Sequence, residues 1–399
     1  MNRRHDIDAL RVLAFGLVIV YHVAMYYVAD WHWHLKSPHA AEWLQTPMRA
    51  LNLWRMDLVF LISGVALGFM QRGRDRLALL RNRSLRLLLP LAFGMAVIVP
   101  FQAYAQAVAN GSIAPGLGAF LLRYAGGGPW PKGAFDGSDF AVTWNHLWYL
   151  PYLWLYTTLL LLLLPLLASR AGQRLRLVFN GLRGLALLIV PALPLMVWSL
   201  TLWPQFPPTH DLVGDGWLHA VYFTLFLYGW CIGTDEPWWA EAARLRWPAL
   251  WTALALLALY LGLRALPAGL GLPRLLLRLT ADAYVWTVLL AMLGWGHARL
   301  NRPWRSLPWA RASVYPWYVL HQTLIIMLVG WLVPLRLGPW LEPALLVAGT
   351  LLACWALTVV VRRTPWLRPL FGLDRSADAA KLRLPARLPH PSPDRPACR

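Results

Sequence analysis

Charged side chains are scarce in this sequence, and acidic ones are the scarcest. Asp, Glu, Lys and Arg make up 14% of the 399 residues, and Asp and Glu together number only 18. A soluble protein carries its apolar residues in stripes between charged ones, so that each element has one face toward water. The lack of charge therefore argues against a soluble enzyme and against a separate soluble domain.

Cysteine is also rare, with only Cys231, Cys354 and Cys398 in the chain. Their spacing matches neither a disulfide framework nor a metal-binding pattern, and two of them lie within apolar runs, so we expect packing residues and no metal site. A cleavable signal peptide is not expected either. The first apolar run is too long, carries Arg11 and His22, and is not followed by a small-residue cleavage site.

Long apolar blocks stand where charge is missing: 58% of the residues are hydrophobic and the mean hydropathy is positive. Blocks near twenty residues are long enough to cross the hydrocarbon core as helices. We predict an all-α, polytopic integral membrane protein with about ten transmembrane helices. The predicted spans are 9–29, 50–70, 87–107, 147–168, 183–203, 216–235, 247–266, 280–298, 313–333 and 341–361.

The excess of basic residues is explained by orientation in a membrane. The formal net charge is +19, which in a soluble protein would suggest nucleic acid binding, but 25 Trp and several spans argue against a nucleic acid partner. Lys and Arg concentrate in alternate connections, with 264–278 as the weakest point of the pattern. The positive-inside rule then predicts that both termini are cytoplasmic.

The chain is expected to contain one domain and a tail. Residues 1–365 are predicted to form the ten-helix transmembrane domain, and 366–399 a basic, Pro- and Arg-rich cytoplasmic tail. This tail composition predicts disorder, and a basic segment of this kind is able to lie on anionic lipid. We find no internal repeat.

Two ionisable residues share one face of the first span. Arg11 and His22 are eleven residues apart, almost a whole number of helical turns, which places them roughly 16 Å apart along the axis. Ionisable groups inside a membrane are costly and are usually functional. We therefore expect His22 to be catalytic, as a general base or as a nucleophile.

The second span runs the opposite way and places Asp57 at a similar depth. A carboxylate there would orient the His22 imidazole and fix its tautomer, so Asp57 is the second predicted catalytic residue. The alternative is a salt link of Asp57 with Arg55 or His22 that only joins two helices.

The third span begins with an arginine pair, Arg83 and Arg86, three residues apart on one helix face. Two guanidinium groups so placed can clamp a phosphate or pyrophosphate by bidentate hydrogen bonds. Arg11 projects from the same predicted side, so the three arginines are expected to converge on an anionic donor. The alternative is that they serve only as topology signals.

Further candidate residues lie at the fourth and ninth spans. His146 and Trp148 open the fourth span, and Tyr318 and His321 lie in the ninth; we expect these four residues to contribute to substrate binding. A lone intramembrane His is often only a packing residue, which is the alternative for His321. The connections 30–49 and 108–146 are rich in Trp, Tyr, His, Gly and Asp, which suits sugar binding or an aromatic belt at the interface.

These motifs together resemble the membrane-bound acyltransferase-3 family. The resemblance rests on Arg11 and His22 with ten residues between them in the first span, MDLVFLISG in the second, Arg83 and Arg86 in the third and YVLHQ in the ninth. It covers residues 5–365. The segments DWHWH, WRMDLVFLISG and HLWYL are most similar to the branch of the periplasmic-glucan succinyltransferases (glucan biosynthesis C proteins). Asp57 beside Arg55, and Gln after His321, depart from the family pattern.

The resemblance implies O-acyl transfer to a carbohydrate outside a bacterial inner membrane, from an acyl-coenzyme A in the cytosol. The acyl group would be acetyl or succinyl, the donor a co-substrate and not a bound cofactor, and the acceptor an exported glycan or glucan in contact with membrane lipids. It also implies an essential His22 and donor handling by Arg11, Arg83 and Arg86. A multi-span transporter or flippase of an anionic or lipid-linked substrate is the alternative, and a membrane sensor or scaffold is a third.

Overall fold

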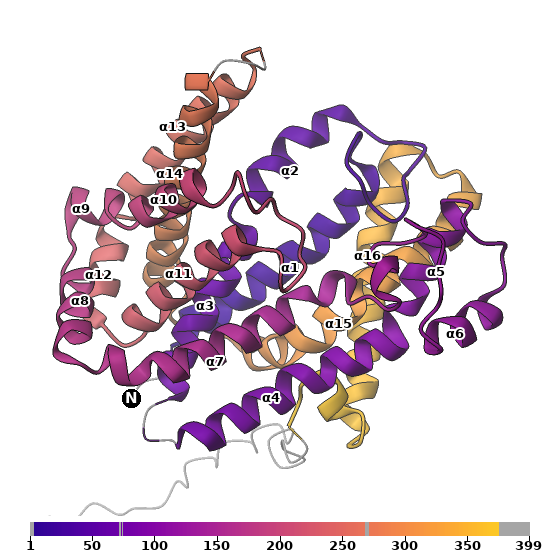
Figure 1. Cartoon of the computed structure of the whole chain (residues 1–399), viewed down its shortest axis with the longest axis horizontal. Coiled ribbons are helices and arrows are strands. Elements are labelled where there is room, and N and C mark those ends of the chain that lie inside the picture. Colours follow the sequence, from indigo (N-terminus) through magenta and orange to yellow (C-terminus); the bar gives the residue numbers. More distant parts are fainter. Residues whose placement is uncertain (1–3, 72, 74, 268–270, 375–399) are drawn as a thin grey trace, which may run out of the picture.

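The computed structural model describes residues 4–374 except 72, 74 and 268–270, and this part of the chain is helical without a β-strand. The helices form one bundle, with α1 running through its middle (Figure 1). Their bounds are α1 His5–Tyr27, α2 Gln45–Asn52, α3 Arg55–Met70, α4 Arg76–Phe93, α5 Pro100–Ala109, α6 Leu117–Ala125, α7 Tyr149–Leu167, α8 Arg170–Asn180, α9 Gly184–Ile189, α10 Ala192–Thr201, α11 Gly216–Ile232, α12 Glu236–Arg244, α13 Arg246–Arg264, α14 Gly271–Leu300, α15 Leu307–Leu332 and α16 Gly338–Arg363.

Each of the ten predicted spans corresponds to a helix or a pair of helices, and the all-α, polytopic architecture is confirmed. Within the described residues, eight helices are long and apolar enough to cross a membrane. A ninth span results if α4 and α5, which are bent by 41° where they meet, are counted together. The remaining predicted span is α11, which is apolar but only 17 residues long. The cytoplasmic placement of both termini stays a prediction.

The bend between α4 and α5 has a local cause. Gly94–Ile98 forms a π-helical segment, and Pro100 follows at the first turn of α5. Proline lacks the N–H that would continue the ladder, and a π segment widens the helix at the same point. The bend brings the polar side chains of α5 over the bundle core.

α1 lies at the centre because three long helices pack around it. α3, α14 and α15 all contact α1, and α3 also packs along α11. Gly64 of α3 and Gly229 of α11 allow that approach, because a Cβ on either glycine would overlap backbone atoms of the other helix. The face of α1 with Arg11, Phe15 and His22 is thereby placed against α3 and α15.

The C-terminal part of the described chain continues the bundle beyond the predicted boundary at residue 365. Arg368–Phe371 forms a 3₁₀ turn, Phe371 is buried, and its ring packs edge-on against Phe93 of α4 at 5.3 Å. The predicted disorder is therefore wrong for 366–374, because an apolar anchor within the basic segment packs on α4. The rest of the predicted tail, with Cys398, lies outside the described residues.

Candidate active site

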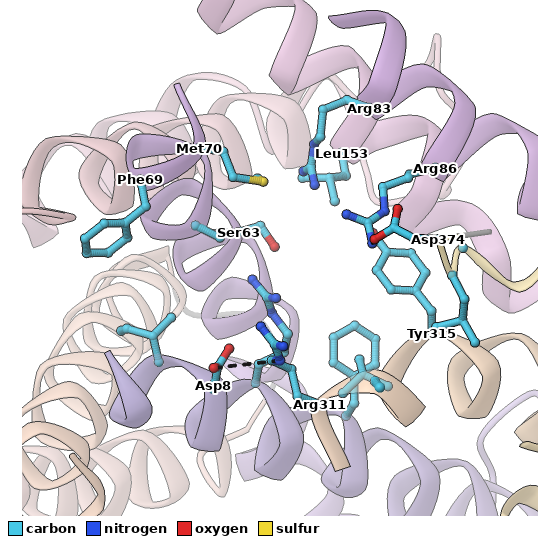
Figure 2. A pocket seen from close by; sticks show the side chains of 18 of the residues that line it. Asp8, Ser63, Phe69, Met70, Arg83, Arg86, Leu153, Arg311, Tyr315 and Asp374 are labelled. Carbon is cyan, nitrogen blue, oxygen red and sulfur yellow. Dashed lines mark hydrogen bonds and ion pairs between the residues drawn. The ribbon is translucent and has the colours of Figure 1, made fainter. Parts of the chain in front are cut away.

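A cavity of about 660 Å³ brings the three predicted anion-binding arginines together. Arg11 reaches it from α1, and Arg83 and Arg86 reach it from α4, so their predicted convergence is confirmed. Figure 2 shows Arg83 and Arg86 across the cavity from Arg311 of α15. We call this space the arginine cavity; its further arginines are Arg4, Arg311, Arg362 and Arg368.

Positive charge in the arginine cavity exceeds negative charge. The carboxylates that line it are Asp8 and Asp374. Arg86 Nη2 lies 3.0 Å from Asp374, and Arg311 Nε lies 3.9 Å from Asp8. Arg83 Nε is buried and has no hydrogen-bond partner among the described residues. Guanidinium groups arranged in this way are suited to an anionic ligand with several phosphate oxygens.

His22 pairs with a second histidine, His321 of α15. Nδ1 of His22 lies 2.9 Å from the carbonyl oxygen of Val18 and 3.1 Å from Nε2 of His321. Nδ1 of His321 in turn lies 2.8 Å from the carbonyl oxygen of Tyr318. A carbonyl oxygen only accepts hydrogen bonds, so in the neutral forms both Nδ1 atoms carry the proton. His321 then accepts from His22.

This tautomer leaves Nε2 of His22 as the basic nitrogen. Among the described residues Nε2 has no hydrogen-bond partner, and His22 is half-buried. His22 is therefore oriented by a partner and keeps the Nε2 lone pair available. A general base needs this arrangement to remove a proton from a hydroxyl, and a nucleophile needs it to attack a carbonyl carbon.

The predicted pairing of His22 with Asp57 is wrong. The His22 ring makes hydrogen bonds to α1 itself and to α15. Asp57 is buried in the first turn of α3, where its charge interacts with Tyr222 of α11 and Asp282 of α14. The physical reason is the rotation of α3 about its axis, which depth alone does not specify. His321, predicted to bind substrate, takes the orienting position instead.

The alternative salt link of Asp57 with Arg55 is not formed within the ion-pair distance among the described residues. The Arg55 guanidinium lies 3.5 Å from the centre of the Tyr21 ring and donates to Asn52 at 3.2 Å.

His146 and Tyr318 hold the position of His321, and their polar groups are occupied by the protein. Nε2 of His146 donates to the carbonyl oxygens of Tyr318 and Val319 at 3.1 and 3.2 Å. The Tyr318 hydroxyl donates to the carbonyl oxygen of His146 at 2.5 Å. The start of the fourth span is thereby fastened to α15. The part of both residues in substrate binding stays a prediction, and in this structure their hydrogen bonds join the segment that carries His321 to the start of the fourth span.

Trp148, the fourth predicted substrate residue, belongs to a different group of aromatic side chains. Its ring centre lies 4.4 Å from that of His210 and 5.2 Å from that of Tyr152. It also stacks near Tyr222 of α11 at 6.0 Å. The structure therefore brings His146, Tyr318 and His321 together with His22, and places Trp148 in a neighbouring aromatic cluster.

A family model described as an acyltransferase domain, that of the acyltransferase-3 family, matches residues 4–359. The chain belongs to the acyltransferase-3 family. The protein is thus a multi-pass membrane acyltransferase, and the match includes every predicted site residue. Comparison with curated proteins and with solved structures gives no match.

The acyltransferase contains a polar network beside the histidine pair that the sequence reasoning missed. Gln102 of α5 donates to Thr323 at 2.7 Å, lies 3.3 Å from Nδ1 of His146, and accepts from Gln322 at 3.1 Å. Gln322 also donates to Nε2 of the buried His34 at 2.8 Å. The spacing of Gln102 and Gln106, four residues apart in an apolar span, was the available signal, because it marks one polar helix face.

Asp136, in the connection between α6 and α7, joins this network to the loop that follows α1. It accepts from Gln106 and from His32, each at 3.0 Å. Burial by itself raises the pKa of Asp136, but the electrostatic interaction with the neighbouring His34 imidazole and the hydrogen bonds from His32 and Gln106 outweigh it and lower the pKa. These contacts therefore stabilise the fold fully above the usual pKa of Asp, about 3.9, and their contribution is lost as the pH falls through the lowered value.

Replacement of Asp136 by alanine is expected to lower the thermal stability of the detergent-solubilised acyltransferase at neutral pH. Because the carboxylate is partly exposed, we expect a loss of about 1 kcal/mol, equal to a few degrees in Tm at most. Asp139→Ala, an exposed carboxylate three residues away, is the matched control. Equal melting temperatures for the two variants would show that Asp136 does not secure the loop.

Proposed function

We propose that this acyltransferase moves an acetyl or succinyl group from a cytosolic acyl-coenzyme A to a hydroxyl of an exported glycan, on the outer side of a bacterial inner membrane. The observation that carries the proposal is the course of α1. Arg11 lines the arginine cavity, and His22 follows on the same helix face roughly 16 Å further on. The phosphates of the donor would then lie in the arginine cavity, and the hydroxyl of the acceptor would approach the thioester carbonyl from the side of His22.

Coenzyme A fits the arginine cavity by its chemistry. Its nucleotide end carries several phosphate groups, which bidentate guanidinium hydrogen bonds recognise. Arg11, Arg83 and Arg86 are the residues proposed to hold these phosphates. The neutral pantetheine arm would follow the face of α1 toward His22, which places the thioester beside the histidine pair.

His22 would act as the general base. Its Nε2 takes the proton of the acceptor hydroxyl while the oxygen attacks the thioester carbonyl carbon. The carbon–sulfur bond then breaks, and the proton passes from Nε2 to the leaving sulfur, which yields the ester and free thiol. His321 supports the transient imidazolium because its Nε2 accepts from Nδ1 of His22 at 3.1 Å.

A two-step route uses the same nitrogen. Nε2 attacks the thioester carbon, coenzyme A leaves as the thiolate, and the acceptor hydroxyl then takes the acyl group from the imidazole. An acyl-enzyme that accumulates in the absence of acceptor would separate this route from direct transfer.

The acceptor is proposed to approach through the connections at the far end of α1. The motifs DWHWH, WRMDLVFLISG and HLWYL favour the branch of the periplasmic-glucan succinyltransferases, so a periplasmic glucan is the first acceptor to examine. Aromatic rings and polar groups around His34 and Trp33 are suited to a carbohydrate, since they offer stacking faces beside hydrogen-bonding groups.

The proposal predicts that cells lacking this protein lose an alkali-labile acyl group from an envelope or periplasmic glycan. Mass spectrometry would compare the glycans of wild-type cells, a deletion strain, and the deletion strain complemented with His22→Ala. The complementing variant must be present in the inner membrane fraction at the wild-type level. The mass difference between the glycans of wild-type cells and those of the deletion strain identifies the acyl group.

Glycans that are unchanged in the deletion strain, or full restoration by His22→Ala, would contradict the proposal. A transporter or scaffold would then be the better account.

A further inference from the structure

The arginine cavity ends before it reaches the histidine pair. Along α1 the described lining residues end at Phe15, and along α15 they end at Tyr315. On α3 the deepest lining residue is Ser63, and on α7 it is Tyr149. The next turns carry Tyr318, His321 and His22, none of which lines the cavity. A layer of side chains therefore separates the cavity from the basic nitrogen of His22.

Three aromatic rings, those of Phe15, Tyr149 and Tyr318, lie in this layer, and each contacts the other two edge-to-face. The ring centres of Phe15 and Tyr318 are 5.5 Å apart, those of Tyr149 and Tyr318 5.9 Å, and those of Phe15 and Tyr149 6.1 Å. Tyr318 lies directly against the histidine pair, with its ring centre 6.1 Å from that of His321. The three rings thus lie between the arginine cavity, which Phe15 and Tyr149 line, and His321.

Two of the three rings are fixed by hydrogen bonds, and one is not. The Tyr318 hydroxyl donates to the carbonyl oxygen of His146 at 2.5 Å. The Tyr149 hydroxyl lies 2.7 Å from Ser63 Oγ, whose own proton goes to the carbonyl oxygen of Val59. Phe15 has no polar group in its side chain. It is half-buried, whereas both tyrosines are buried. Only apolar contacts therefore resist rotation of the Phe15 ring.

We propose that Phe15, Tyr149 and Tyr318 form an aromatic gate between the arginine cavity and the histidine pair, with Phe15 as the moving member. The gate admits the thioester arm of the donor to His22 and excludes water from the thioester when it is closed. The identity of the molecule that passes rests on the proposed function, whereas the gate itself does not.

The test measures access to position 22 without any acyl donor. In full-length protein whose native cysteines are replaced by alanine, His22→Cys in sealed vesicles is labelled with a small anionic, membrane-impermeant thiosulfonate reagent that is added only on the side of the arginine cavity. We expect Phe15→Ala to raise the labelling rate several-fold and Phe15→Trp to lower it. Leu13→Ala, on the exposed face of α1, is the matched control and leaves the rate unchanged.

A labelling rate that is the same with Phe, Ala and Trp at position 15, or that rises equally in Leu13→Ala, would overturn the proposal. Phe15→Leu provides the same comparison if the alanine variant does not fold, because it keeps an apolar contact while removing the ring.

A second measurement uses the chain with native His22 and acetyl-coenzyme A without acceptor. Release of free thiol is expected to increase in Phe15→Ala, since water then reaches the thioester. If labelling responds to Phe15 while no variant consumes the donor, the gate stands and the proposed donor is wrong. If donor is consumed by wild type while labelling is insensitive to Phe15, the donor stands and the gate is wrong.

Discussion

Replacement of His22 by alanine is expected to reduce the rate constant for acyl transfer by about 10²–10⁴-fold, the usual contribution of a positioned general base. The Nε2 lone pair of His22 is the basic group that the histidine pair leaves available, and alanine removes it. The KM for the acyl donor should change little, because the arginine cavity is not lined by His22. Steady-state kinetics of the purified protein with acyl-coenzyme A and glycan would measure both constants.

The matched control for this variant is His39→Ala, in the loop that follows α1. The hydrogen bond given for His39 within the described residues runs from its backbone N–H to Ser37 Oγ, so the substitution keeps it. It should keep wild-type activity. A His22→Ala protein that is correctly folded and retains its transfer rate would show that another group removes the proton.

Replacement of Arg83 by glutamine is expected to raise the KM for the donor by about 10- to 100-fold with little change in kcat. The reason is the loss of charge-assisted hydrogen bonds, each of which contributes about 1.5–3 kcal/mol. Among the three arginines proposed to hold the phosphates, Arg83 has a buried Nε without a hydrogen-bond partner in the described part of the chain, and this N–H can donate to a bound phosphate. Donor titrations, together with direct binding of coenzyme A, would measure the change.

Arg81→Gln is the matched control, because Arg81 lies on the same helix, is exposed, and does not line the cavity. The KM of the wild-type protein should also rise with salt, since ions screen the attraction between arginines and phosphates. An unchanged KM in Arg83→Gln, or an equal increase in Arg81→Gln, would contradict donor binding in this cavity.

Properties that depend on one helix at a time could be predicted from the sequence. Hydropathy located the spans because each is a continuous apolar run. The shared face of Arg11 and His22 follows from helical periodicity alone, and the pairing of Arg83 with Arg86 follows in the same way. Their meeting in one cavity required only that the two helices begin on the same side.

Properties that depend on how helices are rotated against each other could not be predicted. Asp57 was predicted at a depth similar to that of His22, but the orientation of α3 and α15 brings His321 into contact with His22 instead. The hydrogen bond between Gln322 and Gln102 could not be predicted for the same reason, because it joins two helices that lie 220 residues apart in the chain. The packing of 366–374 was missed because the basic, Pro-rich composition is typical of disorder, whereas one buried side chain, Phe371, packs this segment against the bundle.

Transfer of an acyl group from a donor in the arginine cavity to an acceptor on the other side of the membrane can be measured in proteoliposomes. Labelled acyl-coenzyme A is supplied on one side of the bilayer and the glycan acceptor is enclosed on the other. We expect acyl ester on the enclosed glycan with wild-type protein and none with His22→Ala. Acyl ester that forms only when donor and acceptor share one compartment would contradict transfer across the membrane.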